Sequence, residues 1–243
     1  MVPVPRSTFS LFLFRVAALA LSAAPLRVGI DTDGEPMTFL DAKGVPSGFA
    51  VDLMNAIASE MKMEVTYVAK PWAEMMEDFR AGRTDALANI TFTAERARFI
   101  DFTDPHVVMS AAIFVRKGDT TIKTLADLRT QRVAVKLSGA PHAYLVAHGW
   151  DAGILPSQTL RDSLRAVSER RADAALDASI IGSKLLHDER MTNVEIADVS
   201  VRDFAQRLHI GLQPGHAAQG ALINDGIARV RGNGTYDRIY GKW

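Results

Sequence analysis

The chain has no cysteine among its 243 residues and no excess of either charge, with 28 basic and 28 acidic residues. The absence of cysteine excludes disulfide bonds, thiolate metal sites, iron–sulfur clusters and a cysteine nucleophile. The balanced charge argues against a basic nucleic-acid-binding surface. With 48% hydrophobic and 23% charged residues, the composition is that of a globular protein, long enough for one large or two small domains.

Long hydrophobic runs are also missing after residue 24, where no stretch of about 20 residues is apolar enough to span a membrane. Residues 1–24 differ, because Arg6 and Arg15 precede a short apolar run that leads into Ser22-Ala23-Ala24. This order is typical of a secretory signal peptide, and we expect cleavage after Ala23. An uncleaved anchor is the alternative. The mature chain is then expected to be a soluble exported protein.

The common catalytic and cofactor motifs are absent. The six histidines show no metal-ligand spacing, and there is neither a G-x-S-x-G elbow nor a G-x-x-x-x-G-K phosphate loop. Gly232-Asn233-Gly234 is better interpreted as the end of a helix than as a dinucleotide fingerprint. We therefore expect no metal and no cofactor.

Helix-like and strand-like segments alternate along the rest of the chain. Val51, Met54, Ile57 and Met61, for example, recur at helical spacing. Such alternation predicts an α/β fold with mainly parallel sheets. The segments expected to be strands are Leu26–Ile30, Glu64–Val68, Ala86–Ala88, Ala111–Val115, Arg132–Val135, Ala174–Leu176, Val194–Ile196 and Leu208–Leu212.

Two segments resemble each other: Phe79–Leu87 and Val167–Ala175 each combine a helix end, a basic turn and a short strand that begins Asp-Ala. This internal similarity predicts two lobes of similar construction. Ligands of open α/β sheets bind beyond the carboxyl ends of the strands. The residues after Leu87 and after Leu176 are then expected to face each other across a cleft.

Polar residues follow the first of these strands. Asn89 and Thr91 lie at its exit, and Thr93 can cap a helix whose first turn contains Arg96. A guanidinium at this position suits a ligand carboxylate, because its planar fork makes two parallel hydrogen bonds. The alternative is that Arg96 pairs with an acidic neighbour such as Glu95, Asp101 or Asp104 on a solvated face.

Three further features suit a small ligand. Asp177 follows the second strand, where a carboxylate could bind an ammonium group or could instead cap the helix that runs to His187. Trp72 could cover part of a ligand or simply anchor an amphipathic helix. Residues 136–141 follow a strand and precede a helix, whose free N–H groups favour an anion.

Three motifs carry a family resemblance. The segments Gly48–Leu53, Asn89–Pro105 and Asn233–Trp243 resemble the family-3 solute-binding proteins of bacterial polar amino-acid ABC transporters. The resemblance implies two Rossmann-like α/β lobes joined by a two-crossing hinge, the type II periplasmic binding protein architecture. We place the crossings near residues 105–111 and 204–210.

In terms of domains, the resemblance implies a signal peptide at 1–24, lobe 1 at 25–110, lobe 2 at 111–205 and a return to lobe 1 at 206–243. The function it implies is capture of a small zwitterionic ligand, an amino acid or a derivative, in the periplasm and delivery to a membrane ABC permease. We expect a monomer with no nucleic-acid partner.

The resemblance also assigns roles to residues. It implies that Arg96 clamps the ligand α-carboxylate with help from Thr91, and that the backbone carbonyl of Asn89 accepts from the ammonium. Trp72 matches a position that stacks on the ligand, and Asp31 matches one near the side-chain end of the pocket. The second-lobe loop at the carboxylate end contains Lys136, Ser138 and Gly139.

The sequence departs from the family pattern at the ammonium site. Relatives carry the ammonium-binding Asp where this chain has Ala178, and Asp177 stands one residue earlier, which on a strand turns the side chain to the opposite face. The nearby residues Asp31, Asp33 and Glu35 lead us to expect a ligand with a cationic end. Alternative functions are a cyclohexadienyl dehydratase with Glu35 or Asp177 as its acid, a sensory ligand-binding module, and a binder that has lost its ligand.

Overall fold

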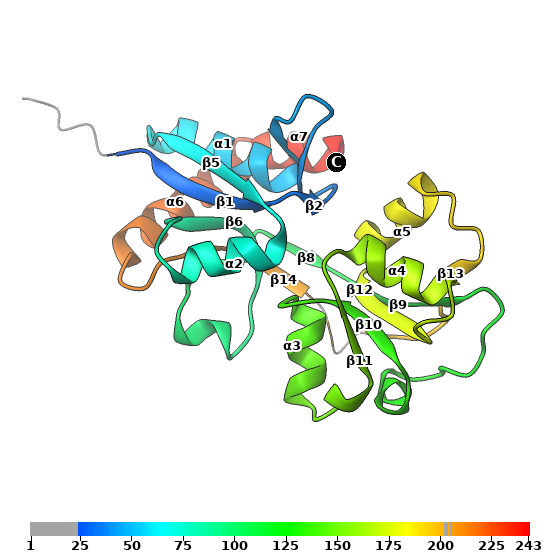
Figure 1. Cartoon of the computed structure of the whole chain (residues 1–243). Coiled ribbons are helices and arrows are strands. Elements are labelled where there is room, and N and C mark those ends of the chain that lie inside the picture. Colours follow the sequence, from blue (N-terminus) through cyan, green and yellow to red (C-terminus); the bar gives the residue numbers. More distant parts are fainter. Residues whose placement is uncertain (1–23, 202–203, 205) are drawn as a thin grey trace, which may run out of the picture.

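The computed structural model describes residues 24–201, 204 and 206–243, so the expected signal peptide lies outside the described residues except for Ala24. The described chain forms two α/β lobes (Figure 1). Lobe 1 is built on the sheet β5-β1-β6-β14-β7, and lobe 2 on the sheet β11-β10-β12-β9-β13. Within the described ranges, none of the helices combines the length and hydrophobicity that crossing a membrane requires. The expected two-lobe α/β fold is confirmed.

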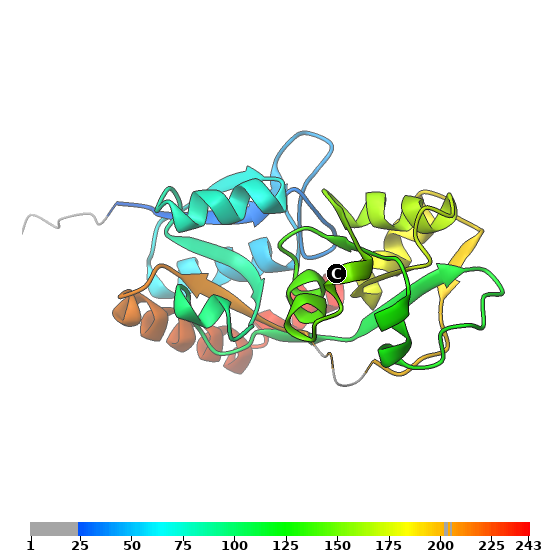
Figure 2. The same cartoon turned by 60° about the horizontal axis from the view of Figure 1, so that its bottom comes forward.

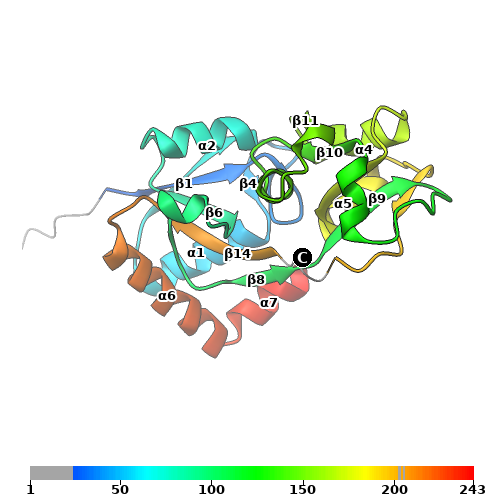
Figure 3. The ribbon, with the colours of Figure 1, turned by 90° about the horizontal axis from the view of Figure 1, so that it is seen from below.

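Lobe 1 contains both ends of the described chain (Figures 1 and 2). Its helices sandwich the sheet: α1, α6 and α7 bury apolar side chains against one face and α2 against the other (Figure 3). Its strands are β1 (Leu26–Asp31), β5 (Val65–Lys70), β6 (Ala86–Thr91), β7 (Asp101–Phe102), β8 (Val107–Met109) and β14 (Gln206–Leu212), with a small sheet of β2 (Asp33–Gly34), β3 (Thr38–Leu40) and β4 (Pro46–Ser47). Its helices are α1 (Phe49–Met61), α2 (Trp72–Arg80), α6 (Ala217–Gly232) and α7 (Thr235–Lys242), with the 3-10 turn η1 (Arg96–Arg98).

Lobe 2 repeats this layering. Helix α3 packs on one face of its sheet, and α4 and α5 pack on the other. Its strands are β9 (Ala111–Arg116), β10 (Val133–Lys136), β11 (Ile154–Ser157), β12 (Ala174–Ala178) and β13 (Val194–Ile196). Its helices are α3 (Ala140–Ala147), α4 (Leu160–Ser168) and α5 (Ser179–Asp188), with the 3-10 turns η2 (Leu125–Thr130) and η3 (Asp151–Gly153).

The internal similarity in the sequence corresponds to a repeat in the structure. In lobe 1 the Arg27 backbone N–H and Nε donate to Asp85, and its Nη2 donates at 2.6 Å to the other carboxylate oxygen. Arg132 makes the same three bonds to Asp173 in lobe 2, with the last at 2.8 Å. Each pair ties the start of one strand to the turn before its neighbour. Equivalent strands of the two sheets therefore begin at equivalent positions, and their carboxyl ends occupy equivalent positions as well.

Antiparallel strands link the lobes and correct the expectation of mainly parallel sheets. β14 runs antiparallel to β6, and β9 runs antiparallel to β12. The chain leaves lobe 1 between β8 and β9, with only Ser110 between them, and returns between β13 and β14 (Figure 3). Strand β9 enters lobe 2 and continues the direction of the crossing, so it runs antiparallel to the neighbouring β12.

The contact between α5 and β9 holds the end of β12 in place and gives a stability test. A Cβ on Gly182 of α5 would lie 2.0 Å from Cζ of Phe114, a fully buried ring on β9. We expect Gly182→Ala to lower the melting temperature by several degrees, because overpacking costs about 1–3 kcal/mol. Gly241→Ala in α7 is the control, since nothing lies within 4 Å of its added Cβ. Equal melting curves for the two variants in calorimetry would contradict this packing.

Candidate functional site

The carboxyl ends of equivalent strands meet between the lobes. Asp31 ends β1 and Lys136 ends β10, and these strands hold the same place in the two sheets. Asn89 on β6 and Asp177 on β12 form a second equivalent pair. Strands β6 and β12 extend beyond their predicted ends, so Asn89 and Asp177 lie on these strands and not in the loops that follow them. One cavity between the lobes is lined by all four residues.

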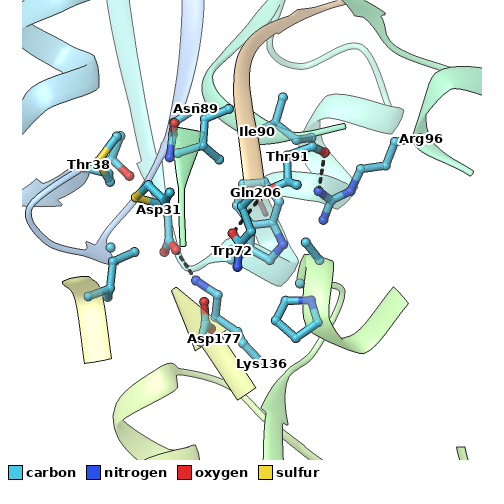
Figure 4. Close-up of a pocket in the computed structure, with 18 residues that line it drawn as sticks. Asp31, Thr38, Trp72, Asn89, Ile90, Thr91, Arg96, Lys136, Asp177 and Gln206 are labelled. Atoms are coloured by element: carbon cyan, nitrogen blue, oxygen red, sulfur yellow. Dashed lines mark hydrogen bonds and ion pairs between the residues drawn. The ribbon is translucent and has the colours of Figure 1, made fainter. Parts of the chain in front are cut away.

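Lys136 forms an ion pair across this cavity. Its Nζ lies 2.6 Å from Oδ2 of Asp31, and the two side chains are only 16% and 9% exposed (Figure 4). Burial by itself would lower the pKa of Lys136, but the charges of Asp31 and Asp177 outweigh burial and raise that pKa above its ordinary value. The ammonium of Lys136 is therefore held in its charged form.

Asp177 is buried beside this ion pair. Burial raises the pKa of Asp177 above its ordinary value, although the charge of Lys136 opposes the shift. Its Oδ1 accepts a 2.7 Å hydrogen bond from the Ala178 N–H. The expectation that Asp177 caps α5 is wrong, because that helix begins at Ser179 and its cap residue is Ala178. Asp177 lines the cavity although it stands one residue before the position of the ammonium-binding Asp in the family pattern. Ala178, which occupies that position, packs into the apolar core of lobe 1.

Arg96 is buried on the opposite side of the cavity, with 5% of the residue exposed. Nη1 donates at 2.8 Å to the Thr91 carbonyl, and Nη2 donates at 2.7 Å to the Ser138 carbonyl of lobe 2. Thr93 Oγ1 accepts from the Arg96 N–H, but the expectation that Thr93 caps a helix is wrong, because the element is the short 3-10 turn η1 and its cap residue is Glu95. Burial lowers the pKa of Arg96 to about 10.

The environment of Arg96 excludes the surface-pair alternative. No ion pair of Arg96 with Glu95, Asp101 or Asp104 occurs in the part of the chain that the structure describes. Its two protein acceptors are uncharged carbonyls, and a guanidinium carries five N–H donors. A buried cation without a counter-ion is costly, so this site favours an incoming carboxylate.

Trp72 begins α2 and lies close to both cations. The Arg96 guanidinium carbon is 5.5 Å from the centre of its indole ring, and Lys136 Nζ is 5.8 Å from it. The indole Nε1 donates at 3.0 Å to the same Ser138 carbonyl that Arg96 uses. The ring thus lies close to both cations, and its N–H fastens lobe 1 to the loop before α3.

Nearly all of the residues predicted for the site line one cavity. They are Asp31, Trp72, Asn89, Thr91, Arg96, Lys136, Gly139 and Asp177. Ser138 is not part of this lining, and it contributes only the carbonyl that Arg96 and Trp72 share. The lining residues that the sequence reasoning missed are Met37, Thr38, Ile90, Met109, Ile181, Gln206 and Leu208.

Gln206 is the most informative of the missed residues. It is 4% exposed at the start of β14, and its Oε1 lies 3.3 Å from the donating Thr91 hydroxyl (Figure 4). Among the described residues, Gln206 Nε2 and Asn89 Oδ1 are buried without a hydrogen-bond partner. A polar residue two positions before the apolar run Leu208–Leu212, at the expected second crossing, was the signal that could have found it.

Each of the three acidic residues expected to attract a ligand cation already has a basic partner in lobe 2. Besides the Asp31–Lys136 pair, Asp33 lies 3.6 Å from Arg161 of α4, and Glu35 lies 3.3 Å from Lys184 of α5. We refer to these as the three lobe-crossing pairs. The expectation of a ligand with a cationic end rested on these three neighbouring carboxylates, and it stays a prediction, although each of them is paired with a basic residue in the structure.

A two-lobed α/β protein with polar groups gathered between its lobes has the architecture of a solute-binding protein. Residues 26–243 match the sequence profile of the bacterial extracellular solute-binding proteins, family 3, and the chain belongs to this family. The resemblance noted in the sequence is thereby confirmed.

Individual relatives agree with this assignment. The chain is 29% identical over 238 residues to the lysine/arginine/ornithine-binding periplasmic protein of Escherichia coli K12, covering 93% of this chain and 91% of that protein. A histidine kinase sensor domain with similarity to periplasmic binding proteins matches with a TM-score of 0.86 and 34% identity, over 91% of this chain and 96% of that one. An arginine-bound ancestral arginine-binding protein matches with a TM-score of 0.81 and 26% identity, over 91% and 99%.

The raised pKa of Asp177 predicts an unusual stability effect. A carboxyl whose pKa is raised by folding destabilises the native state above that pKa, and the cost disappears as pH falls through it. We expect Asp177→Asn to raise the melting temperature at about pH 7, with the gain shrinking toward about pH 4.

Asp85→Asn provides a control of opposite sign. The hydrogen bond from Arg27 lowers the pKa of Asp85, so this carboxylate stabilises the fold above its unfolded pKa and loses that effect as pH falls. We expect this variant to melt earlier at about pH 7 and like the parent in acid. A lower melting temperature for Asp177→Asn at neutral pH would contradict the role of burial at Asp177.

Proposed function

We propose that this protein binds an amino acid between its lobes in the periplasm and delivers it, as a monomer, to a membrane ABC permease. The observation that carries the proposal is the buried Arg96, whose hydrogen-bond acceptors among the described residues are the uncharged carbonyls of Thr91 and Ser138. Its remaining N–H donors suit an α-carboxylate. Family membership and the relatives named above support the same function.

The remaining site residues have complementary roles in this proposal. Asp177 and the unpartnered Oδ1 of Asn89 accept from the ligand ammonium. Trp72 covers the ligand stem, and Thr91 supports the carboxylate end together with the loop that contains Ser138 and Gly139. Asp31 and Lys136 form the wall at the other end of the cavity.

Closure of the lobes follows from the distribution of these groups. Arg96, Trp72 and Asn89 belong to lobe 1, whereas Asp177 and Gly139 belong to lobe 2. A ligand that contacts both sets binds the closed arrangement better than an open one, so binding shifts the population toward closure.

We propose binding rather than catalysis for this cleft. The dehydratase alternative requires a positioned acid. Glu35 is 42% exposed, pairs with Lys184 and lies outside the cavity lining, which suits a surface ion pair better than an acid catalyst. Asp177 faces a cation and accepts a backbone N–H, and both favour its acceptor role. Product formation from prephenate or arogenate would contradict the proposal.

A sensory module is the second candidate, favoured by the 34% identity to a histidine kinase sensor domain. Both candidates need the same ligand site and differ in their partner. Deleting the gene in its own bacterium separates them: a transport protein is required for uptake of radiolabelled ligand, whereas a sensor is required for a ligand-dependent change in transcription.

Replacement of Arg96 tests the proposal directly. We expect Arg96→Ala to abolish the ligand-induced rise in melting temperature in an amino-acid screen while the fold persists, because the carboxylate loses its charged partner. Arg98→Ala is the matched control, since it removes an exposed arginine of the same turn η1. Retention of micromolar affinity by Arg96→Ala would contradict the assignment.

A further inference from the structure

We propose that Lys136 is a built-in cation that excludes ligands with a positively charged side chain, so that this site selects amino acids whose side chains are uncharged. The inference rests on the proposed amino-acid-binding function and adds the ligand class. Lys136 lines the cavity and pairs with Asp31, the carboxylate at the end of the cavity far from Arg96 (Figure 4).

The position of the ammonium carries the argument. Lys136 projects from lobe 2 between two carboxylates, with Nζ 2.6 Å from Asp31 and under the electrostatic influence of Asp177 (Figure 4). A basic ligand side chain would need one of these carboxylates as its counter-ion. In the closed arrangement it would meet the Lys136 ammonium already there. Two like charges next to each other in a buried site repel each other strongly, so this arrangement rejects a basic ligand.

The charge balance of the cavity leads to the same conclusion. Its lining holds two cations, Arg96 and Lys136, and two carboxylates, Asp31 and Asp177. A zwitterion leaves this balance unchanged, whereas a basic amino acid adds one buried positive charge without a partner. An acidic side chain beside Asp31 and Asp177 adds one negative charge in the same way.

Nearby carboxylates do not supply the missing counter-ion. Asp33 is engaged by Arg161, and Glu35 is engaged by Lys184, so both are paired outside the cavity lining. Gly34 and Thr38, which are uncharged, also line the cavity next to Asp31, since a Cβ on Gly34 would lie 3.3 Å from the Thr38 hydroxyl and 3.6 Å from Asp31 Oδ2. The chemistry left for a ligand side chain is apolar contact or neutral hydrogen bonding.

Titration calorimetry of the mature protein with five amino acids tests this. Glutamine, threonine and leucine represent uncharged side chains, and arginine and lysine represent basic ones. We expect the parent to bind its best uncharged amino acid roughly 10- to 100-fold more tightly than arginine or lysine. In Lys136→Ala, which frees Asp31 and leaves room, we expect arginine to gain about tenfold or more relative to the uncharged ligand.

Two further variants keep the result interpretable. Lys136→Met preserves the length of the side chain and serves if Lys136→Ala does not fold, with the same change in preference expected. Lys184→Ala removes the lysine of an outer lobe-crossing pair and should leave the ratio of the two affinities unchanged.

The outcomes separate this inference from the function beneath it. Parent protein that binds arginine or lysine as tightly as any uncharged amino acid overturns the role of Lys136 and leaves the proposed function standing. An unchanged preference in the Lys136 variants also overturns it. Failure of the parent to bind any of the five overturns both.

Discussion

The cost of burying charge governs how the two lobes fit together. Arg96, Lys136 and Asp177 are removed from water in the cleft, and a buried charge without partners is strongly unfavourable. The partners come from the opposite lobe in two of these cases: Asp31 for Lys136, and the Ser138 carbonyl for Arg96. A few electrostatic contacts between the lobes thus stabilise the closed arrangement.

Two sheets of similar construction, one in each lobe, hold these charged residues. The Arg27–Asp85 and Arg132–Asp173 pairs hold the starts of equivalent strands in the same way, and because they are partly exposed each stabilises the fold only modestly. The strand ends above them have diverged instead: Asp31 is matched by Lys136, and Asn89 by Asp177. The two lobes therefore share the geometry at the starts of these strands and differ in the residues at the strand ends. This difference gives the cleft two sides of complementary charge.

Local sequence patterns predicted much of this architecture. The spacing of apolar residues located the main strands and helices, and the Asp-Ala repeat located the two strand ends that meet in the cleft. The predicted ends of β6 and β12 came too early in the sequence. Apolar periodicity shows which apolar residues of a strand are buried, but it does not show that a buried polar residue such as Asn89 or Asp177 also belongs to the strand. The antiparallel direction of β9 was missed because it depends on how the chain crosses between lobes.

The ion pair of Asp31 with Lys136 was beyond local reasoning for a stronger reason. The two residues are 105 positions apart and belong to different lobes, so neither spacing nor composition brings them together. Read separately, Asp31, Asp33 and Glu35 suggested an acidic mouth that attracts a cation. Only the closed geometry shows that each has a basic partner across the cleft.

The depth of the lobe-crossing pairs determines what each can contribute. The Asp33–Arg161 and Glu35–Lys184 pairs have side chains 25–42% exposed, where an ion pair is worth only about 0.2–1 kcal/mol and is weakened by salt. These outer pairs suit weak, reversible guidance of closure. The inner Asp31–Lys136 pair is shielded from water, so any ligand group that disturbs it meets an unscreened charge. Closure and ligand discrimination can therefore be carried by different members of one row of ion pairs.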